Sequence, residues 1–366
     1  MIRVLQVMGG LGFGGAQEIV MNIYRNIDRS NVQFDFVAFA DSGSDYAKEI
    51  LDLGGVIYTC PKYMVYNHRE FCGWWNNFFH VHKEYRIVHG HLMGSAAVYL
   101  YIAKKAGCIT ISHSHNIAET KITLYYLVSW IYQRPIRYIA DYFLACSREA
   151  GEYLFGDKII NSNKFRIVEN GIDTNRFSFS MDSRTKVRNE YGIKDEFVVG
   201  NIARLYYQKN YSFFIDVIYE LIKMDSAVMG LIVGAGPELG LLRKKADKLG
   251  ISNKLIFAGA HPNPEAYYCA MDAFLCPSHY EGLSIATVEA QSTGLNSFVS
   301  ENVPNMADMK ADLYKKLSLN AGAKKWAEEI YKCKGKCRVS RGDMVRKSGF
   351  DIKNTSFEME RFYKSL

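Results

Sequence analysis

Two series of short apolar runs alternate with helical patterns along this 366-residue chain. The first series comprises RVLQVM, FDFVAFA, YRIVHGHL, CITISHSH and YFLACS, and the second comprises FVVGNIAR, MGLIVGAG, KLIFAGA, AFLCPS and NSFVS. Segments with helical spacing, such as 16–26 and 211–223, separate these runs. Strands that alternate with helices form a parallel sheet covered by helices on both faces. Each series therefore predicts one doubly wound α/β domain.

A turn signal and a polar segment separate the two series. The NGID sequence at 170–173 is typical of a turn, and polar residues follow as far as Lys194. A chain of this length also exceeds what one hydrophobic core usually supports. We expect an N-terminal domain over 1–170 and a C-terminal domain over 171–350. Ligands of such sheets lie beyond the carboxyl ends of strands, so the chemistry is expected in the cleft between the domains.

The composition is that of an ordinary globular protein, with 48% apolar and 23% charged residues. No apolar run reaches the roughly 18 residues of a membrane-spanning helix, and the first residues alternate like a strand, not like a secretory leader. The eight cysteines form no CxxC pair, which favours reduced thiols over a disulfide framework. We therefore expect a cytoplasmic protein, without a zinc site at the close pair Cys333 and Cys337.

The net charge of +7 is concentrated after position 300, where 15 lysines and arginines stand against 9 aspartates and glutamates. Solvated lysine-rich helices explain this charge most simply. A second hypothesis is peripheral attraction to the anionic face of a membrane, to which each basic group near the surface contributes about 1 kcal/mol. Nucleic acid is not an expected partner, because no recognised binding motif accompanies the charge.

Five glycines lie between positions 9 and 15, where the first predicted strand runs into a helix. Glycine lets the backbone approach a ligand closely, and a helix start offers free N–H groups to an anion. An ordinary turn needs fewer glycines, so we favour a ligand-binding loop. The loop lacks the Gly-Lys-Ser/Thr of a P-loop and the later acidic residue of a dinucleotide fingerprint. LIVGAGPELG at 231–240 fails the same spacing test, and we expect a strand-end turn near a nucleotide there.

Two His-x-His pairs end consecutive predicted strands: His89 and His91 in VHGHL, and His113 and His115 in SHSHN. Histidines at the carboxyl ends of neighbouring parallel strands favour a functional role over a purely structural one. Zinc binding is the competing explanation. Successive residues of a regular strand point to opposite faces, so only one histidine of each pair is expected to face a given site. On that ground we do not expect a metal.

A basic loop follows the first strand of the second domain. Arg204 and Lys209 lie in VVGNIARLYYQKN, just after the predicted strand ends. Fixed positive charge at this place suits a diphosphate, whose negative charge needs neutralising as a bond to it breaks. Two solvated side chains in an ordinary loop would give the same pattern, so the pair alone does not decide between the two explanations.

Two glutamates flank a glycine turn in HYEGLSIATVE at 279–289. We expect a helix that begins with Ser284 as N-cap and is stopped by Gly294. Its N-terminal N–H groups would face a phosphate, with Glu281 beside them and Glu289 just over one turn into the helix. Carboxylates accept hydrogen bonds from hydroxyls, and a sugar nucleotide carries hydroxyls on both sides of its diphosphate. This spacing therefore indicates a sugar-nucleotide site.

Taken together, these stretches resemble glycosyltransferase family 4. The resemblance rests on Glu-x7-Glu in PSHYEGLSIATVEAQSTGL, on Arg204 with Lys209, on the NGID turn, on the GGA loop at 14–16 and on SHSHN at 112–116, and it covers nearly the whole chain. The chain is most similar to bacterial enzymes of capsular and exopolysaccharide assembly. The resemblance implies the GT-B fold, with two Rossmann-like doubly wound parallel-sheet domains facing each other across a cleft. It also implies that the helical segment 351–366 returns to the first domain.

The resemblance implies a retaining transfer of a sugar from a nucleotide sugar, for which we expect a UDP-sugar, without a cofactor or an essential metal. Six residues of the second domain are implicated in donor binding: Arg204, Lys209, Glu281, Leu283, Ser284 and Glu289. The basic pair would hold the diphosphate as leaving group, and the first glutamate would bind hydroxyls of the transferred sugar. The two residues of the glycine turn would contact the phosphates through their backbone, and the second glutamate would take the ribose.

In the first domain, the resemblance places Gly14 and Gly15 against the donor phosphate and the acceptor. It assigns the active-site histidine to His115, with His113 as the rival because the motif offers both. The acceptor would be a glycan or a polyprenyl-linked glycan. The aromatic and basic segment 121–137 is either an acceptor-side interfacial helix or part of the core.

Two departures leave the donor and acceptor open. The family commonly continues Gly-Leu-Pro after the second glutamate, whereas Leu295 is followed here by Asn296, and the sequence beyond Pro304 is idiosyncratic. The alternatives to a transferase are a sugar-nucleotide epimerase of the same fold and a sensor that binds a sugar nucleotide without turnover. The sequence does not identify the sugar, the base, the linkage or the number of assembled chains.

Overall fold

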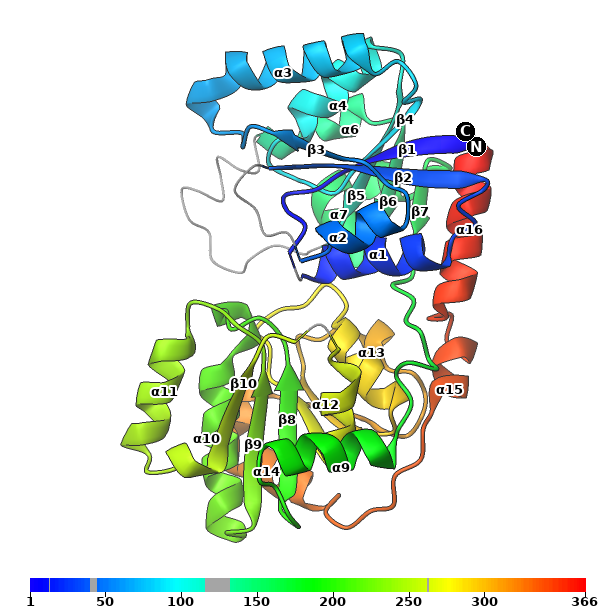
Figure 1. The fold of residues 1–366 in the computed structure, drawn as a ribbon. Coiled ribbons are helices and arrows are strands. Elements are labelled where there is room, and N and C mark those ends of the chain that lie inside the picture. Colours follow the sequence, from blue (N-terminus) through cyan, green and yellow to red (C-terminus); the bar gives the residue numbers. More distant parts are fainter. Residues whose placement is uncertain (13, 40–44, 116–131, 262) are drawn as a thin grey trace. The chain divides into compact units, whose positions relative to one another are not determined.

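The chain forms two compact units in its computed structural model (Figure 1). Unit 1 comprises Met1–Gly171 together with Ile352–Leu366, and unit 2 comprises Ile172–Asp351. The structure describes residues 1–12, 14–39, 45–115, 132–261 and 263–366. Within these residues, no helix combines the length and the apolar character needed to cross a bilayer.

Unit 1 contains a seven-stranded sheet with the order β3-β2-β1-β4-β5-β6-β7, and every neighbouring pair is parallel. Its strands are β1 Ile2–Val7, β2 Val32–Phe39, β3 Ile57–Cys60, β4 Ile87–Gly90, β5 Ile109–Ser114, β6 Tyr142–Ala145 and β7 Phe165–Ile167. All five strands predicted from the first series are present. The structure adds β3 and β7, the two edge strands, which the sequence did not indicate.

Helices cover both faces of this sheet, as expected for a doubly wound domain (Figure 1). The helices are α1 Gly15–Asn26, α2 Ala47–Asp52, α3 His68–Val81, α4 Ala96–Lys105, α6 Ile136–Ile139, α7 Arg148–Phe155, α8 Asp157–Ile160 and α16 Ile352–Lys364. On one face, Trp75 of α3 and Tyr99 of α4 are fully buried in the same cluster as Leu5 and Val88 of the sheet. On the other face, Tyr24 of α1 stacks on a ring of β2.

The C-terminal helix α16 packs within unit 1, against α1 and β2. Tyr363, which is 1% exposed, meets Phe34 of β2 edge-on, and Arg166 lies over the ring of Phe362. Both chain termini therefore lie at the same end of the unit (Figure 1). This packing buries the side chain of Tyr363, near the end of the chain, in the interior of unit 1.

Unit 2 contains a six-stranded parallel sheet with the order β10-β9-β8-β11-β12-β13. Its strands are β8 Phe197–Ile202, β9 Val228–Val233, β10 Leu255–Gly259, β11 Ala273–Cys276, β12 Asn296–Ser300 and β13 Tyr314–Leu317. The five strands predicted from the second series are all present. The short edge strand β13 was not predicted.

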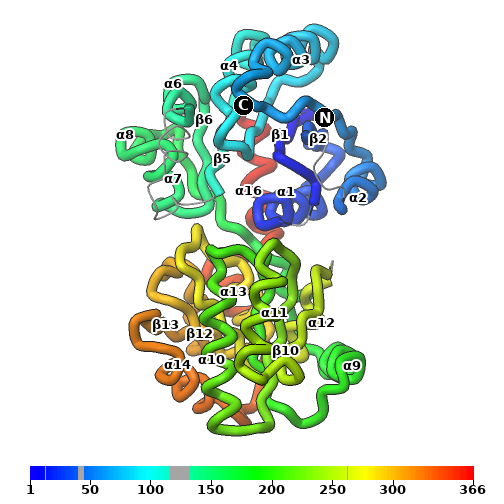
Figure 2. The backbone as a smooth tube through the Cα atoms, turned by 90° about the vertical axis from the view of Figure 1, so that its left-hand side faces the viewer, coloured from blue at the N-terminus to red at the C-terminus, as the bar shows by residue number. Residues whose placement is uncertain are grey.

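Alternating side chains of the unit 2 strands pack into two hydrophobic cores, one on each face of the sheet. The helices are α9 Met181–Glu190, α10 Tyr211–Met224, α11 Leu239–Lys248, α12 Glu265–Ala270, α13 Ile285–Ser292, α14 Gly322–Tyr331 and α15 Gly342–Lys347. Val199 faces the core under α10, α11 and α14, whereas its neighbour Val198 faces the core under α9, α12, α13 and α15. Figure 2 shows α10 and α11 side by side over the first of these faces. The fold is thus two doubly wound α/β domains, as predicted.

Candidate active site

Two glycines after β9 allow the loop after β8 to lie directly against them. A Cβ at Gly234, where φ is +144°, would lie 2.0 Å from the carbonyl oxygen of Ala203. A Cβ at Gly236 would lie 2.3 Å from the carbonyl oxygen of Leu205. Close backbone packing therefore accounts for Gly234 and Gly236 in LIVGAGPELG. Its effect is to fix the backbone on both sides of Arg204.

Arg204 itself is exposed on this loop, and its guanidinium lies 5.1 Å from the ring centre of Tyr206. Within the described part of the chain, no ion pair or hydrogen bond is recorded for its side chain. Arg204 and Lys209 both lie on the loop after β8, as predicted, and their joint role in holding a diphosphate remains a prediction.

Hydrogen bonds tie the loop after β8 to the loop after β11. The backbone N–H of His279 donates to the carbonyl of Gln208 at 2.8 Å, and the side-chain amide of Gln208 donates to the carbonyl of Tyr280 at 3.0 Å. These two bonds bring Lys209 and Glu281, which are 72 positions apart in the chain, into direct contact.

The Lys209 ammonium donates to Oε1 of Glu281 at 2.6 Å, and the hydroxyl of Ser278 donates to the same oxygen at 2.7 Å. Glu281 is only 4% exposed, so this carboxylate is removed from water and needs these donors. Both recorded hydrogen bonds fall on Oε1. A pre-positioned carboxylate with a second oxygen still to be used, next to a cation, is suited to a hydroxyl-bearing and anionic ligand.

The helix that follows begins as predicted, with Ser284 at the N-cap of α13, but its hydroxyl does not cap the helix. Ser284 has a φ of +69°, and its Oγ lies 2.7 Å from the hydroxyl of Thr287. A non-glycine residue in this left-handed region is strained, and such strain concentrates at functional sites. The first turn of α13 is thereby left without a side-chain cap. Leu283, which is 3% exposed, packs in the core and holds the turn in place. Gly294 follows the helix as expected.

Glu289 lies on α13 and is 7% exposed. The phenolic O–H of Tyr268 donates to its Oε2 at 2.6 Å. Burial and the neighbouring carboxylate together raise the pKa of Tyr268 well above its usual value, so the phenol remains a donor. Glu289 is therefore held in one orientation by a side chain that the sequence analysis did not single out.

In unit 1, the glycine loop leads into α1. Gly14 occupies the N-cap in an extended conformation, and Gly15 is the first helical residue. A Cβ at Gly15 would meet no atom within 4 Å, so neither sterics nor backbone conformation in the described residues requires glycine there. Open space in front of a helix start remains consistent with the predicted contact to a ligand.

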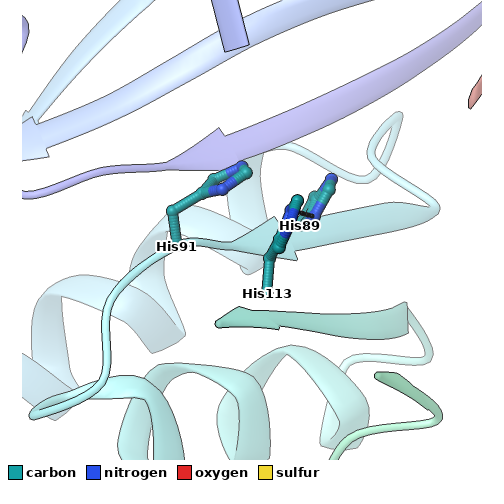
Figure 3. A group of neighbouring side chains, drawn as sticks. All are labelled: His89, His91 and His113. Atoms are coloured by element: carbon teal, nitrogen blue, oxygen red, sulfur yellow. Dashed lines mark hydrogen bonds between the residues drawn. The ribbon is translucent and has the colours of Figure 1, made fainter. Parts of the chain in front are cut away.

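The four histidines gather into one cluster, which corrects the expectation that only one of each pair would face a given site. Nε2 of His89 lies 3.2 Å from Nδ1 of His113, and Nδ1 of His91 lies 2.8 Å from Nε2 of His115. The prediction was wrong because the two histidines of each pair stand two positions apart, and residues i and i+2 of a strand point to the same face. Figure 3 shows three of these imidazoles side by side.

The cluster is electrically neutral at ordinary pH, because burial lowers all four imidazole pKa values. The pKa values of His89, His91 and His113 fall well below the usual value, and that of His115 falls to about 4. One nitrogen from each of the first three histidines could meet at a metal, since these atoms lie within 4.8 Å of one another. In the structure, nitrogens of these histidines form hydrogen bonds with one another, with Gln6 and with Tyr363. The absence of a metal remains a prediction.

Two partners of the cluster were missed by the sequence analysis. Nε2 of His91 lies 2.8 Å from Oε1 of Gln6 on β1, and Nδ1 of His89 lies 2.7 Å from the hydroxyl of Tyr363 on α16. Gln6 could have been found, because it is a polar residue flanked on both sides by apolar residues in RVLQVM. No local signal marks Tyr363. The predicted interfacial segment 121–137 lies mostly outside the described residues.

Comparison with known proteins places this chain in a family. Residues 13–176 match the family described as Glycosyltransferase Family 4, and residues 183–334 match the one described as Glycosyl transferases group 1. EpsF of Bacillus subtilis (strain 168), a protein assigned as a glycosyltransferase, is 30% identical over 335 residues, which are 90% of this chain and 86% of EpsF.

Two further relatives carry more specific names. An Escherichia coli enzyme named UDP-Gal:alpha-D-GlcNAc-diphosphoundecaprenol alpha-1,3-galactosyltransferase is 25% identical over 227 residues, which are 60% of this chain and 58% of that enzyme. The crystal structure of Anabaena HepE in complex with UDP and glucose matches with a TM-score of 0.82 and 18% identity, and the match covers 100% of both chains. The chain is therefore a glycosyltransferase that belongs to family 4 and has the GT-B fold.

Proposed function

We propose that this protein transfers a sugar, with retention of configuration, from a UDP-sugar to a glycan carried by a polyprenyl diphosphate, in the assembly of a surface polysaccharide. The observation that carries the proposal is the contact between Lys209 and Glu281 beside the first turn of α13, which has no side-chain cap. A cation, a helix N-terminus and a carboxylate together match the diphosphate and the hydroxyls of a sugar nucleotide.

Each donor-site residue has a separate task in this proposal. Lys209, whose three N–H groups are not all used by Glu281, also donates to the diphosphate, and the exposed Arg204 swings onto it. Oε2 of Glu281 accepts from a hydroxyl of the transferred sugar. Glu289 accepts from the ribose, and the backbone of Leu283 and Ser284 contacts the phosphates. Charge stabilisation of the departing diphosphate and positioning supply most of the rate, without a metal or a cofactor.

Unit 1 supplies the acceptor side in the proposal, through the glycine loop at Gly14 and Gly15 and through the histidine cluster with His115 as its active member. The names of the relatives support this division of substrates. The Escherichia coli enzyme is named for a UDP-sugar and a lipid diphosphate acceptor, and HepE was solved with UDP and glucose. We place the reaction on the cytoplasmic side of the membrane, with the basic C-terminal region in peripheral contact with its lipids.

The proposal is tested with Lys209→Met and Glu281→Gln, which remove a charge and keep the side-chain shape. Each variant is assayed with UDP-glucose, UDP-galactose and UDP-N-acetylglucosamine, with N-acetylglucosamine on a short polyprenyl diphosphate as acceptor. Mass spectrometry follows the product, and proton NMR reads its anomeric configuration. We expect turnover to fall at least about tenfold in each variant, equivalent to about 1.4 kcal/mol of barrier.

Lys245→Met is the matched control, because Lys245 forms a 2.6 Å ion pair with Asp216 on the surface of the same unit. This change should leave turnover as in the wild type. Normal turnover in both site variants would remove the assignment. A changed sugar nucleotide formed without acceptor would identify an epimerase, and binding without transfer, epimerisation or donor hydrolysis would identify a sensor.

A further inference from the structure

Four imidazoles in unit 1 form two hydrogen-bonded pairs, and both pairs lead to the side-chain amide of Gln6. This amide is 1% exposed and lies on the central strand β1. Its oxygen contacts the first pair at His91, and its nitrogen donates to the hydroxyl of Tyr363, which contacts the second pair at His89. The direction of each hydrogen bond can be followed outward from this one amide.

The first series of hydrogen bonds, from Gln6 through His91 to His115, ends in a free lone pair. The amide oxygen of Gln6 can only accept, so Nε2 of His91 carries the proton of the 2.8 Å hydrogen bond between them. A neutral imidazole has one N–H, so Nδ1 of His91 accepts, and Nε2 of His115 must donate to it at 2.8 Å. The remaining nitrogen of His115, Nδ1, is then unprotonated. It is buried and has no hydrogen-bond partner in the described structure.

The second series of hydrogen bonds, from Gln6 through Tyr363 and His89 to His113, ends in a free N–H. The amide nitrogen of Gln6 donates to the oxygen of Tyr363 at 3.4 Å, so the phenolic proton is available to Nδ1 of His89 at 2.7 Å. Nε2 of His89 then carries the proton and donates to Nδ1 of His113 at 3.2 Å. The remaining nitrogen of His113, Nε2, is protonated. It too is buried without a partner among the described residues.

Both series depend on neutral imidazoles, since a doubly protonated ring has no lone pair to accept with. Burial supplies this condition by lowering the pKa of every ring in the cluster. Buried polar groups are normally paired, and an unpaired one costs about 1–3 kcal/mol. The two unpaired nitrogens, which belong to stacked rings with centres 4.1 Å apart, are therefore suited to bind a polar group of a ligand.

We propose that Gln6 is a positioning residue that gives the free nitrogens of His113 and His115 opposite hydrogen-bonding roles. Nε2 of His113 donates and Nδ1 of His115 accepts, and an alcohol group, which can accept from the first and donate to the second, is the ligand chemistry that fits. The inference rests on the proposed function in one respect: the alcohol is a hydroxyl of the acceptor. The tautomers themselves follow from the hydrogen bonds alone.

The coupling has a specific signature, because reversal of the Gln6 amide would reverse every bond in both series. In the recorded orientation His89, His91, His113 and His115 all carry their proton on Nε2, and in the reversed orientation all four carry it on Nδ1. Either way one free nitrogen donates and the other accepts. Independent histidines would be under no such constraint.

Nitrogen-15 NMR of the 366-residue protein with labelled histidine measures the tautomers directly, because protonated and unprotonated ring nitrogens have well-separated chemical shifts. At pH 7.5 in the presence of a metal chelator, we expect four neutral cluster histidines that all have the Nε2–H tautomer. A single Nδ1–H tautomer among the four, or a charged ring, would overturn the inference. This measurement needs only the wild-type chain.

Two variants distinguish the two series of hydrogen bonds. Gln6→Met removes both ends of the amide in a side chain of similar size, and it should produce a mixture of tautomers at His91 and His115. Tyr363→Phe should produce a mixture at His89 and leave the His91 and His115 tautomers unchanged, because the amide oxygen is still present. Unchanged tautomers in Gln6→Met, with folding verified by circular dichroism, would refute the role of Gln6.

Donor hydrolysis, with water as the simplest alcohol, links the tautomers to turnover. We expect Gln6→Met to lower kcat for UDP-sugar hydrolysis by about fivefold, because the loss of one hydrogen bond lowers the fraction of molecules with the required tautomers. The affinity for UDP should be unchanged. Equal kcat in the variant with altered tautomers would contradict the alcohol site. If the wild type bound no UDP at all, the proposed function would fail while the tautomer result stood.

Discussion

The histidine cluster should make unit 1 sensitive to mild acid. The pKa of His115 is lowered to about 4 by burial, whereas an unfolded histidine titrates near 6.5. Between these values the unfolded chain binds a proton that the folded chain refuses. The free energy of unfolding therefore falls as pH drops through this window, and it is fully retained above it.

The magnitude follows from the linkage relation. From pH 6.5 to pH 5, at about 1.36 kcal/mol per unit, His115 alone contributes a loss of about 2 kcal/mol. Burial also lowers the pKa values of the other three rings well below the usual value, so their contributions have the same sign. Carboxylates with lowered pKa values, such as Asp141, act at lower pH and do not confound the window.

Urea titrations at pH 7.5 and pH 5, each read by a brief peroxide pulse and mass spectrometry of methionine oxidation, measure the two units separately. Met8 and Met21 are buried in unit 1, and Met271 and Met309 are buried in unit 2. Replacement of His115 by glutamine should reduce the pH-dependent loss in unit 1 by about 2 kcal/mol.

The control is His80→Gln, which removes an exposed histidine of α3 and leaves the cluster intact. This variant should keep the full pH dependence of the wild type. The reasoning would be refuted if unit 1 of the wild type were equally stable at both pH values. It would also be refuted if His115→Gln and His80→Gln behaved alike.

Three further outcomes are expected. Gly234→Ala should destabilise unit 2 by about 3 kcal/mol in urea titrations, because its Cβ would overlap the carbonyl of Ala203, whereas Gly240→Ala, where a Cβ meets no atom, should not. Tyr268→Phe should weaken UDP binding about fivefold in calorimetry, because Glu289 loses the donor that orients it; unchanged affinity would argue against the ribose assignment. Dialysis against zinc should leave the histidine cluster without stoichiometric metal, and one bound equivalent by elemental analysis would show the opposite.

Central strands were predictable from the sequence, whereas three edge strands were not. Each predicted strand is a run of apolar residues, because both faces of a doubly wound sheet are covered by helices. The strands β3, β7 and β13 are three or four residues long and lie at edges, where a strand has only one neighbour. β7 exposes Arg166, and β13 exposes Lys315. Polar residues in so short a segment erase the apolar pattern on which the prediction depends.

The positions of the residues that we propose bind the donor were predictable from the sequence, but their contacts were not. The sequence placed Lys209 and Glu281 in loops after strands, and their direct contact depends on hydrogen bonds between two loops. The orientation of the Ser284 hydroxyl depends on a positive φ that no local pattern signals. The histidine prediction applied strand alternation wrongly, because the two histidines of each pair are two positions apart and therefore share one face of a strand.

Hydrogen exchange measured by mass spectrometry with and without UDP tests the central claim, that a nucleotide diphosphate is bound by the loops after β8 and β11 and by the start of α13. We expect UDP to slow exchange in peptides that cover 204–210 and 278–286 and to leave peptides from α11 unchanged. Slowed exchange only elsewhere, or none at saturating UDP, would contradict the account.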